Sequence, residues 1–405
     1  MLDKHYSSRQ RLWIVSLTIV LDLSFLFYFK YFNFVVDNIN GVLATDFQLL
    51  DVIMPIGISF YTFQAMSYLI DVYRREVPAQ KDVYKLALYI VLFPQLVAGP
   101  IVKYHDVCEQ IDNRTIEFKN VIIGFKRFIT GLAKKVLIAN TLAEVVDKIF
   151  AQAPENLTTG VSWLGAVAYC LQLYYDFSGY SDMAIGLGLM FGFRFLENFN
   201  YPYISKSITE FWRRWHISLA TWFKLYLYIP LGGNRKGAVR TYWNLFAVFL
   251  VTGIWHGAAW SYVAWGIWNG IFIVIERFFG LDKDKNDRWY VSAAKHVYAF
   301  FAIVWGMIIF RAESLSYAYE YICRMLHIDV TKHLPDYDYG VNNKFAIMLI
   351  VGLICAMPVC RNLIYIKYEH KVQRTLVNIW LFLLFFWSTI SLAASTYNPF
   401  IYFRF

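Results

Sequence analysis

Long apolar segments are the feature that most constrains how this sequence can fold. A helix that crosses a bilayer needs about 20 consecutive, mainly apolar residues. The clear candidates are Leu12–Phe32, Leu50–Ile70, Leu86–Val102, Val161–Tyr175, Trp243–Phe279 (long enough for two helices), Val297–Phe310, Phe345–Val359 and Leu376–Ala394. Two others are less clear, because Val121–Ile149 contains basic residues and Asp182–Phe195 is short. We therefore expect about eight to eleven complete or partial spans.

Composition excludes the other classes of protein. Hydrophobic residues make up 58% of the 405 residues and charged residues 17%, whereas soluble domains have roughly 45–50% and about 25%. A disordered chain needs low hydrophobicity, and a soluble globule of this size cannot hide so much apolar surface. The sequence therefore predicts an all-α integral membrane protein with many spans, which forms a single domain over residues 1–405. We expect no removable signal peptide, so the first helix should remain in the mature protein.

The charge pattern points to a membrane partner. The formal net charge is +9, from 38 Lys and Arg against 29 Asp and Glu. The basic residues cluster between apolar segments, as in loops that face the cytoplasm and anionic headgroups. These clusters are Lys126, Arg127, Lys134 and Lys135, then Arg213 and Arg214, then Arg235, Lys236 and Arg240. No separate basic face exists, so we expect no nucleic-acid partner.

Helix breakers and polar residues within the apolar windows predict an internal cavity. Pro55 and Gly57 interrupt one window, and Pro94, Gly99 and Pro100 interrupt the next. A broken segment is tolerated in lipid only where protein or a wet cavity satisfies the freed backbone groups. Intramembrane polar residues usually face inward, and here they include Gln64, Gln95, Asp176 and Asp182. The five cysteines are scattered and include no C-x-x-C pair, so we expect no metal site.

His256 is the first of two histidines that can carry chemistry. It lies within the long apolar stretch, and we expect it mid-way along an apolar helix. Burial of an ionisable ring there is costly, while the adjacent Gly253, Gly257, Ala258 and Ala259 allow close approach of another helix or a substrate. A neutral imidazole at this position is suited to accept a proton from a hydroxyl group. The alternative is a core histidine that hydrogen-bonds to a neighbouring helix.

His216 is the second candidate, in an aromatic segment with basic residues near its start. Helical spacing would place Trp212, His216, Leu219 and Phe223 on one face. Such a helix can lie in the membrane interface, where Trp rings and Arg head groups are both stable. Alternatively, it enters the cavity and brings His216 beside His256. Helical periodicity does not decide between these interpretations.

Seven long strings give the sequence a resemblance to a known family. They lie at Met54–Arg74, Leu92–Tyr104, Tyr175–Tyr203, Phe211–Arg235, Thr252–Trp260, Phe310–Leu315 and Tyr397–Phe405. In this order they resemble the membrane-bound O-acyltransferases, and more narrowly the branch that contains the membrane subunit of bacterial alginate O-acetylation. The resemblance implies a curved helical ring with re-entrant or interfacial helices around a central tunnel. It also implies that His256 is the catalytic histidine and that His216 is the second site residue.

Two departures from the family pattern bear on these expectations. Family members usually carry extra hydrophobic sequence before the segment that matches Leu12–Phe34, so we expect either that one or more outer helices are absent here or that the protein begins further upstream. Many relatives also have a histidine where this sequence has Asn269. Asn cannot act as an acid or base, so Asn269 is not counted as catalytic.

The resemblance implies transfer of an acyl group, expected to be acetyl, from a cytoplasmic thioester. The donor is acetyl coenzyme A or an acyl carrier protein, and no cofactor is expected to stay bound. His256 would be the general base, and His216 would orient the donor or stabilise charge on the carbonyl oxygen. The expected substrate-binding residues are Trp212, Arg213, Arg214, Trp215 and Trp255. The tryptophans would exclude water and the arginines would attract coenzyme A phosphates, although a cytoplasmic position explains the arginines equally well.

The implied setting is the inner membrane of a bacterium. In the resembled branch a separate extracytoplasmic acetyltransferase of the SGNH type receives the acetyl group and modifies a polysaccharide. Two other functions are compatible with the same cavity. One is a transporter of lipid-linked sugars, which would be expected to show internal repeat symmetry. The other is a scaffold for polysaccharide export. The sequence does not identify the polymer.

Overall fold

The computed structural model describes residues 7–97, 99–282, 288–327, 337–360, 371–395 and 397. Within these ranges the secondary structure is helical and contains no strand, which confirms the predicted all-α class. The first segment contains α1 (Ser8–Leu26), the π-helical turn η1 (Phe27–Tyr31), α2 (Phe32–Leu43), α3 (Ile58–Arg74), α4 (Val83–Val91), α5 (Phe93–Leu96) and α6 (Tyr104–Asn113). The second contains α7 (Phe118–Ala133), the π-helical turn η2 (Lys134–Ala139), α8 (Asn140–Phe150), the 3₁₀ turn η3 (Pro154–Asn156) and α9 (Thr159–Met190).

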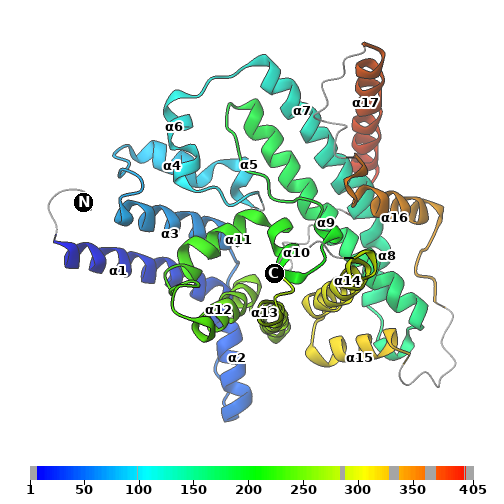
Figure 1. The fold of residues 1–405 in the computed structure, drawn as a ribbon, viewed down its shortest axis with the longest axis horizontal. Coiled ribbons are helices and arrows are strands. Elements are labelled where there is room, and N and C mark those ends of the chain that lie inside the picture. Colours follow the sequence, from blue (N-terminus) through cyan, green and yellow to red (C-terminus); the bar gives the residue numbers. More distant parts are fainter. Residues whose placement is uncertain are drawn as a thin grey trace.

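The remaining helices complete a ring-like arrangement. They are the 3₁₀ turn η4 (Pro202–Ile204), α10 (Ile208–Arg214), α11 (Ile217–Phe223), the π-helical turn η5 (Lys224–Tyr228), α12 (Ala238–His256), α13 (Trp260–Phe279), α14 (Trp289–Arg311), α15 (Leu315–Met325), α16 (Asn343–Cys355), the 3₁₀ turn η6 (Pro358–Cys360) and α17 (Lys371–Ala394). Figure 1 shows the short helices α10 and α11 near the middle of the view, with longer helices on all sides. The central position of these two short helices is what places their side chains in the interior.

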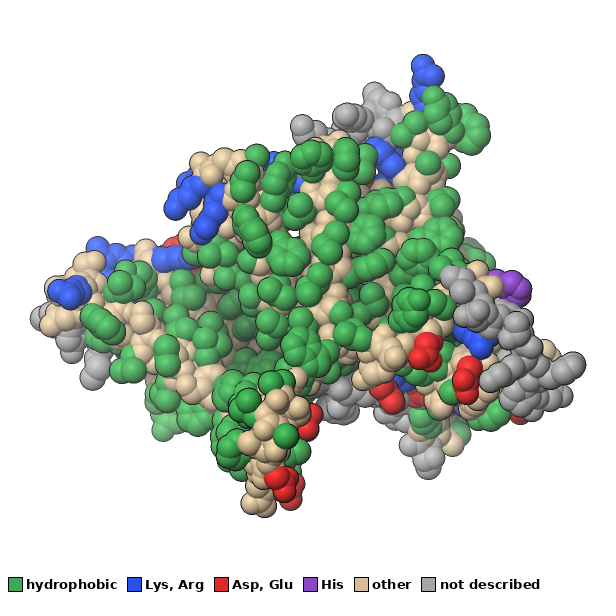
Figure 2. All heavy atoms as spheres, turned by 90° about the horizontal axis from the view of Figure 1, so that it is seen from below, with side chains coloured by type: hydrophobic (Ala, Val, Ile, Leu, Met, Phe, Trp, Pro, Cys, Tyr) green, Lys and Arg blue, Asp and Glu red, His purple; other side chains and the backbone are tan. Residues whose placement is uncertain are grey.

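Three of the described helical segments are long and apolar enough to cross a membrane: Ser8–Leu43, Trp289–Arg311 and Val372–Ala394. Many of their exposed side chains are large and apolar, as with Trp13 on α1 and Phe382 on α17, and hydrophobic side chains cover most of the face in Figure 2. Several of the other predicted windows hold shorter or interrupted helices, whereas Val161–Tyr175 lies within the continuous α9. Helix α3 begins only after Gly57, and α4 ends at Val91 ahead of the four-residue α5. The predicted helix breaks at Gly57 and Pro94 are therefore present.

Close helix contacts depend on paired glycines. A Cβ atom at Gly124 would collide with the carbonyl oxygen of Gly186, and one at Gly131 with that of Gly179, so α7 and α9 can approach this closely only without side chains there. In the same way, Gly253 on α12 faces Gly266 on α13. Small residues at helix interfaces are the usual means of close packing in membrane proteins.

Helix α10 is held at its start by a buried carboxylate. Glu276 of α13 is fully buried and accepts hydrogen bonds from the backbone N–H groups of Ile208 (2.5 Å) and Thr209 (2.8 Å) and from the hydroxyl of Tyr298 (3.1 Å). The first N–H groups of a helix have no partner within it, and a carboxylate there also interacts favourably with the helix dipole. Glu276 therefore fixes the start of α10, the helix that precedes His216 in the chain.

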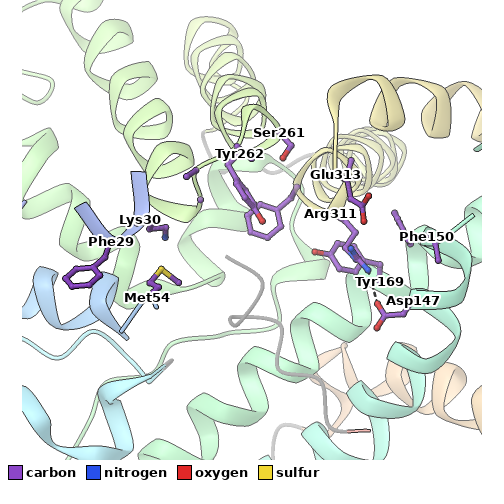
Figure 3. Close-up of a pocket in the computed structure, with 16 residues that line it drawn as sticks. Phe29, Lys30, Met54, Asp147, Phe150, Tyr169, Ser261, Tyr262, Arg311 and Glu313 are labelled. Carbon is purple, nitrogen blue, oxygen red and sulfur yellow. Dashed lines mark hydrogen bonds and ion pairs between the residues drawn. The ribbon is translucent and has the colours of Figure 1, made fainter. Parts of the chain in front are cut away.

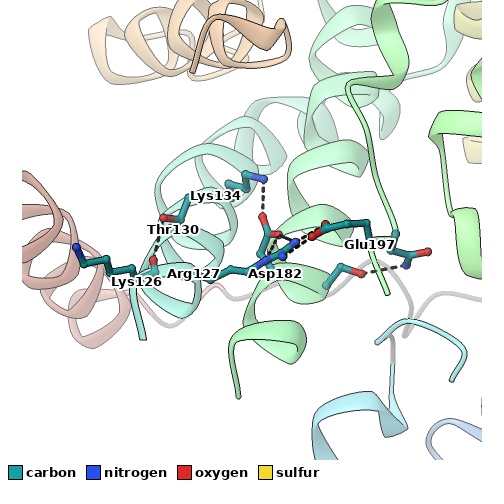
Figure 4. A network of polar contacts seen from close by, with 8 residues as sticks. Lys126, Arg127, Thr130, Lys134, Asp182 and Glu197 are labelled. Atoms are coloured by element: carbon teal, nitrogen blue, oxygen red, sulfur yellow. Dashed lines mark hydrogen bonds and ion pairs between the residues drawn. The ribbon is translucent and has the colours of Figure 1, made fainter. Parts of the chain in front are cut away.

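Basic residues that were predicted to lie in cytoplasmic loops are partly built into the helices instead. Arg127, on α7, binds Asp182 of α9 and Glu197, and Lys134 binds the other oxygen of Asp182 at 2.6 Å (Figure 4). Lys135 pairs with Asp176 at 2.5 Å. The loop prediction was wrong for these cations, because nearby carboxylates compensate their burial. Arg235, Lys236 and Arg240 are exposed, as a surface position requires.

These ion pairs also change the interpretation of the polar residues within the apolar windows. Gln64, Gln95 and Asp176 are buried and Asp182 nearly so, which agrees with their predicted inward position. However, none of the four lines any of the three cavities described below. The two carboxylates serve ion pairs between helices instead.

Candidate active site

His256 is the last residue of α12 and is followed by Gly257 in an extended conformation. The expectation that it lies mid-way along a helix was therefore wrong. The apolar stretch is continuous in sequence, but the chain breaks at residues 257–259 before α13 begins. The imidazole is buried, and the rings of Trp255, Trp265 and Phe310 surround it at centroid distances of 4.9, 5.0 and 5.1 Å. All three contacts are edge-to-face, a favourable arrangement for aromatic rings.

The backbone carbonyls at this end of α12 are bound by two side chains from η1. The ammonium of Lys30 donates to the carbonyls of Trp255 (2.8 Å) and His256 (3.0 Å) and to the hydroxyl of Ser59 (3.2 Å). The hydroxyl of Tyr31 donates to the carbonyl of Ile254 at 2.9 Å. Our sequence analysis missed Lys30. A lone lysine inside the apolar window Leu12–Phe32 is a signal that could have found it, because charges in such segments are rare and usually functional.

His216 is not on a continuous helix. It lies between α10 and α11 with a positive φ of 46°, so the predicted shared helical face with Trp212 and Phe223 was wrong. A positive φ is uncommon outside glycine, and residues held in such conformations cluster at functional sites. A periodicity argument cannot detect this break, because it assumes a helix throughout.

Asn198 determines which nitrogen of His216 carries the proton. Its Oδ1 accepts hydrogen bonds from the backbone N–H (3.1 Å) and hydroxyl (2.9 Å) of Ser218, and it lies 3.2 Å from His216 Nδ1. Since Oδ1 is an acceptor, Nδ1 must donate to it. The neutral ring then has its lone pair on Nε2, which is buried and has no hydrogen-bond partner among the described residues.

We expect substitution of Asn198 by alanine to destabilise the protein by about 1–3 kcal/mol, because it leaves the buried N–H of Ser218 without an acceptor. It should also lower acyl transfer, since His216 loses its orienting contact. Thermal unfolding in detergent and a transfer assay check the two effects. The matched control is Asn200→Ala, since Asn200 is exposed two residues away. Equal stability of the two variants would contradict this role of Asn198.

The structure brings the two histidines into one aromatic cluster. The ring of Phe177 lies 4.6 Å from the His216 ring and lines a cavity together with His256. The centroid of the Phe60 ring lies 6.4 Å from that of His216 and 5.6 Å from that of Trp255. The two imidazoles are thus linked through shared aromatic neighbours, in agreement with the interpretation in which His216 enters the interior.

Three cavities are lined by residues at or directly after the end of α12. The smallest has a volume of about 20 Å³ and is lined by His256 with Leu173, Phe177, Trp212, Trp215, Trp265, Met307 and Phe310. The second, of about 250 Å³, is lined by His256, Lys30, Trp255 and residues 54–60. The largest, of about 660 Å³, is lined by Gly257, with Lys30 and Met54 on one side and Tyr169, Arg311 and Glu313 on the other (Figure 3). His256 therefore borders one cavity large enough for a reactant and a second that has room for about one water molecule.

The remaining predicted binding residues divide into two groups. Trp212, Trp215 and Trp255 line the cavities that contain His256. Arg213 is exposed, Arg214 pairs with Glu210 at 2.8 Å, and neither lines the three cavities, so their role toward coenzyme A stays a prediction. Asn269 accepts a hydrogen bond from the Trp212 indole at 3.0 Å. Within the described ranges, no group of three His, Cys, Asp or Glu side chains could hold a metal ion.

Comparison with known proteins identifies the family. The sequence model of the MBOAT, membrane-bound O-acyltransferase family, matches residues 75–316, a region that contains His216 and His256. The chain belongs to this family. Membership makes it a membrane protein and an O-acyltransferase, and it confirms the resemblance drawn from the sequence motifs. Of those motifs, Tyr397–Phe405 lies outside the described residues except for Tyr397.

Three relatives of the chain are named for acetyl transfer. The chain is 43% identical to a probable alginate O-acetylase AlgI from Pseudomonas putida, over 97% of the chain and 84% of that protein. Identity is 50% to the corresponding protein of Pseudomonas aeruginosa, over 76% of the chain and 59% of that protein. A peptidoglycan O-acetyltransferase from Helicobacter pylori is 33% identical, over 89% of the chain and 75% of that protein. These three relatives therefore differ in polymer but agree in the transferred group.

Proposed function

We propose that this chain transfers an acetyl group from a thioester donor to a hydroxyl acceptor, with His256 as the general base. The observation that carries the proposal is the position of His256, a buried imidazole on which a cavity of about 250 Å³ and an aromatic cavity of about 20 Å³ converge. A reactant in the larger cavity can then approach the ring, and holding the reactants beside it lowers the entropic part of the barrier; the smaller cavity has room for about one water molecule. The acetyl relatives support the choice of transferred group.

The proposed reaction transfers one proton and one acetyl group. His256 takes the hydroxyl proton while the hydroxyl oxygen attacks the thioester carbonyl carbon. The tetrahedral intermediate then expels the thiolate, which receives that proton from the imidazolium. The products are an O-acetyl ester and a free thiol. The surrounding rings of Trp255, Trp265 and Phe310 exclude water, which would otherwise hydrolyse the thioester.

The geometry of His216 favours one of its two expected roles. Because its Nδ1 donates to Asn198, the neutral ring offers a lone pair on Nε2 and no second proton. A group of this kind accepts a hydrogen bond from the donor or acceptor molecule and so orients it. Stabilisation of a developing oxyanion requires a hydrogen-bond donor, which the neutral His216 does not provide.

The setting of the reaction completes the proposal. The donor is acetyl coenzyme A or an acetylated acyl carrier protein on the cytoplasmic side of the bacterial inner membrane, and a tunnel through the helical ring carries its acyl end to His256. The acceptor lies on the other side, as a polysaccharide hydroxyl or as the hydroxyl of a partner acetyltransferase of the SGNH type. Chain similarity to proteins of alginate and peptidoglycan acetylation supports this setting.

Labelled acetyl transfer in membranes tests the function. Membranes that contain the chain are incubated with acetyl coenzyme A or acetylated carrier protein, labelled in the acetyl group, and compared with membranes that lack it. We expect chain-dependent release of label from one donor, to an added polysaccharide, a partner protein or water. A transporter or scaffold would leave the label on both donors, and that result would overturn the proposal.

A further inference from the structure

We infer that Lys30 is a positioning residue that fixes the catalytic end of α12, an inference that rests on the proposed role of His256. The three donors of its ammonium bind the carbonyls of Trp255 and His256 and the hydroxyl of Ser59. A lysine ammonium has three N–H donors, so every donor of Lys30 is engaged. The residue thereby joins the π-helical turn η1, the first turn of α3 and the last turn of α12.

Such a clamp meets a physical need at this end of α12. The last carbonyls of a helix have no partner within the helix, and in the membrane interior bulk water cannot supply one. A positive charge also interacts favourably with the partial negative charge at a helix C-terminus. Lys30 supplies both hydrogen bonds and a positive charge at the carbonyls of Trp255 and His256. The Tyr31 hydroxyl satisfies the carbonyl of Ile254.

The position of the clamp explains why it bears on catalysis. The chain leaves the helical conformation at Gly257, directly after His256, so no further helical turn holds the histidine backbone. Lys30 also lines both the 250 Å³ and the 660 Å³ cavities, with its ammonium 5.9 Å from the centre of the Trp255 ring. Loss of the clamp would free the backbone of residues 254–256 and shift the imidazole relative to both reactants.

The π-helical turn that carries Lys30 supports the same assignment. Five residues, Phe27–Tyr31, form this turn between α1 and α2. Single π-helical turns within α-helices are rare and are frequent at functional sites. The two adjacent polar side chains of this turn, Lys30 and Tyr31, both bind the end of one helix more than 220 residues away in sequence.

Lys30→Met removes the charge and all three donors while it keeps an unbranched side chain. We expect kcat for acetyl transfer to fall by up to about 100-fold, the scale for a misplacement of about 1 Å, with the KM for the donor nearly unchanged. Lys30→Arg, which keeps a cation with several donors, should recover part of kcat. Tyr31→Phe, which loses one hydrogen bond, should have a smaller effect. The matched control is Lys224→Met, because Lys224 is an exposed lysine on the π-helical turn η5.

Hydrogen exchange separates this inference from the proposed function. In Lys30→Met the amides of residues 252–257 should exchange faster than in the wild type, while the rest of the chain is unchanged. Unchanged exchange and kcat, a raised KM alone, or faster exchange throughout the chain would each overturn the positioning role. If the wild type transfers no acetyl group, the proposed function fails, whereas the exchange measurement still tests the clamp. Equal amounts of each variant are compared, taken from its purified, monodisperse fraction.

Discussion

Replacement of His256 by alanine is expected to abolish most acetyl transfer without loss of folded protein. General-base catalysis contributes about 10²–10⁴-fold, so the rate with a saturating donor should fall by that factor. The fold should persist, because the hydrogen bonds from Lys30 that hold this end of α12 are made to the backbone carbonyls, which alanine retains. The measurement is initial transfer of labelled acetyl groups per amount of purified protein, with thermal unfolding of each sample.

The control is another histidine on a helix, outside the three cavities. His296 lies half-buried on α14, where its Nδ1 is 2.8 Å from the carbonyl of Ser292, and it lines none of the three cavities. His296→Ala should transfer acetyl groups at the wild-type rate. If His256→Ala and His296→Ala behave alike, His256 is not the base. If His256→Ala instead lowers the folded amount and the activity together, the histidine has a packing role.

Sequence reasoning was strongest where composition and whole motifs carry the information. The excess of apolar residues predicted a helical membrane protein, and the strings around His216 and His256 predicted the family, because each string is long and in family order. The length of Trp243–Phe279 correctly allowed for two helices. The breakers Gly57 and Pro94 also marked real helix ends, since each acts through its own backbone.

Sequence reasoning failed where structure depends on contacts between distant segments. Periodicity shows which residues share a face if a helix continues, but it does not show where the helix stops. It therefore placed His256 within a helix and His216 on a regular face, although one ends a helix and the other has a positive φ. The clamp of Lys30 on α12 joins residues 225 positions apart. The partner of a buried charge leaves no local pattern, so Arg127 was assigned to a loop.

Loss of the Arg127 side chain is expected to cause the largest fall in stability. Arg127→Met leaves Asp182, whose side chain is only 15% exposed, with Lys134 as its remaining described cation. Removal of one partner of a buried ion pair typically costs about 3–5 kcal/mol, and the remaining bond to Lys134 favours the lower end of that range. Thermal or denaturant unfolding in detergent measures the change. Because none of the side chains in this network lines the three cavities, the surviving folded fraction should retain its turnover per molecule.

An exposed ion pair of similar length provides the matched control. Lys85 and Asp112 are 2.5 Å apart, but each side chain is 42% exposed, and water compensates charges that lose their partner at the surface. Lys85→Met should therefore leave the unfolding transition nearly unchanged. The double variant Arg127→Met with Asp182→Asn should recover part of the lost stability, because the orphaned buried charge is removed along with its partner. Equal effects of Arg127→Met and Lys85→Met would show that burial does not set the strength of this network. No recovery in the double variant would show that Arg127 acts through its packing, since the charge on Asp182 would then not be the source of the instability.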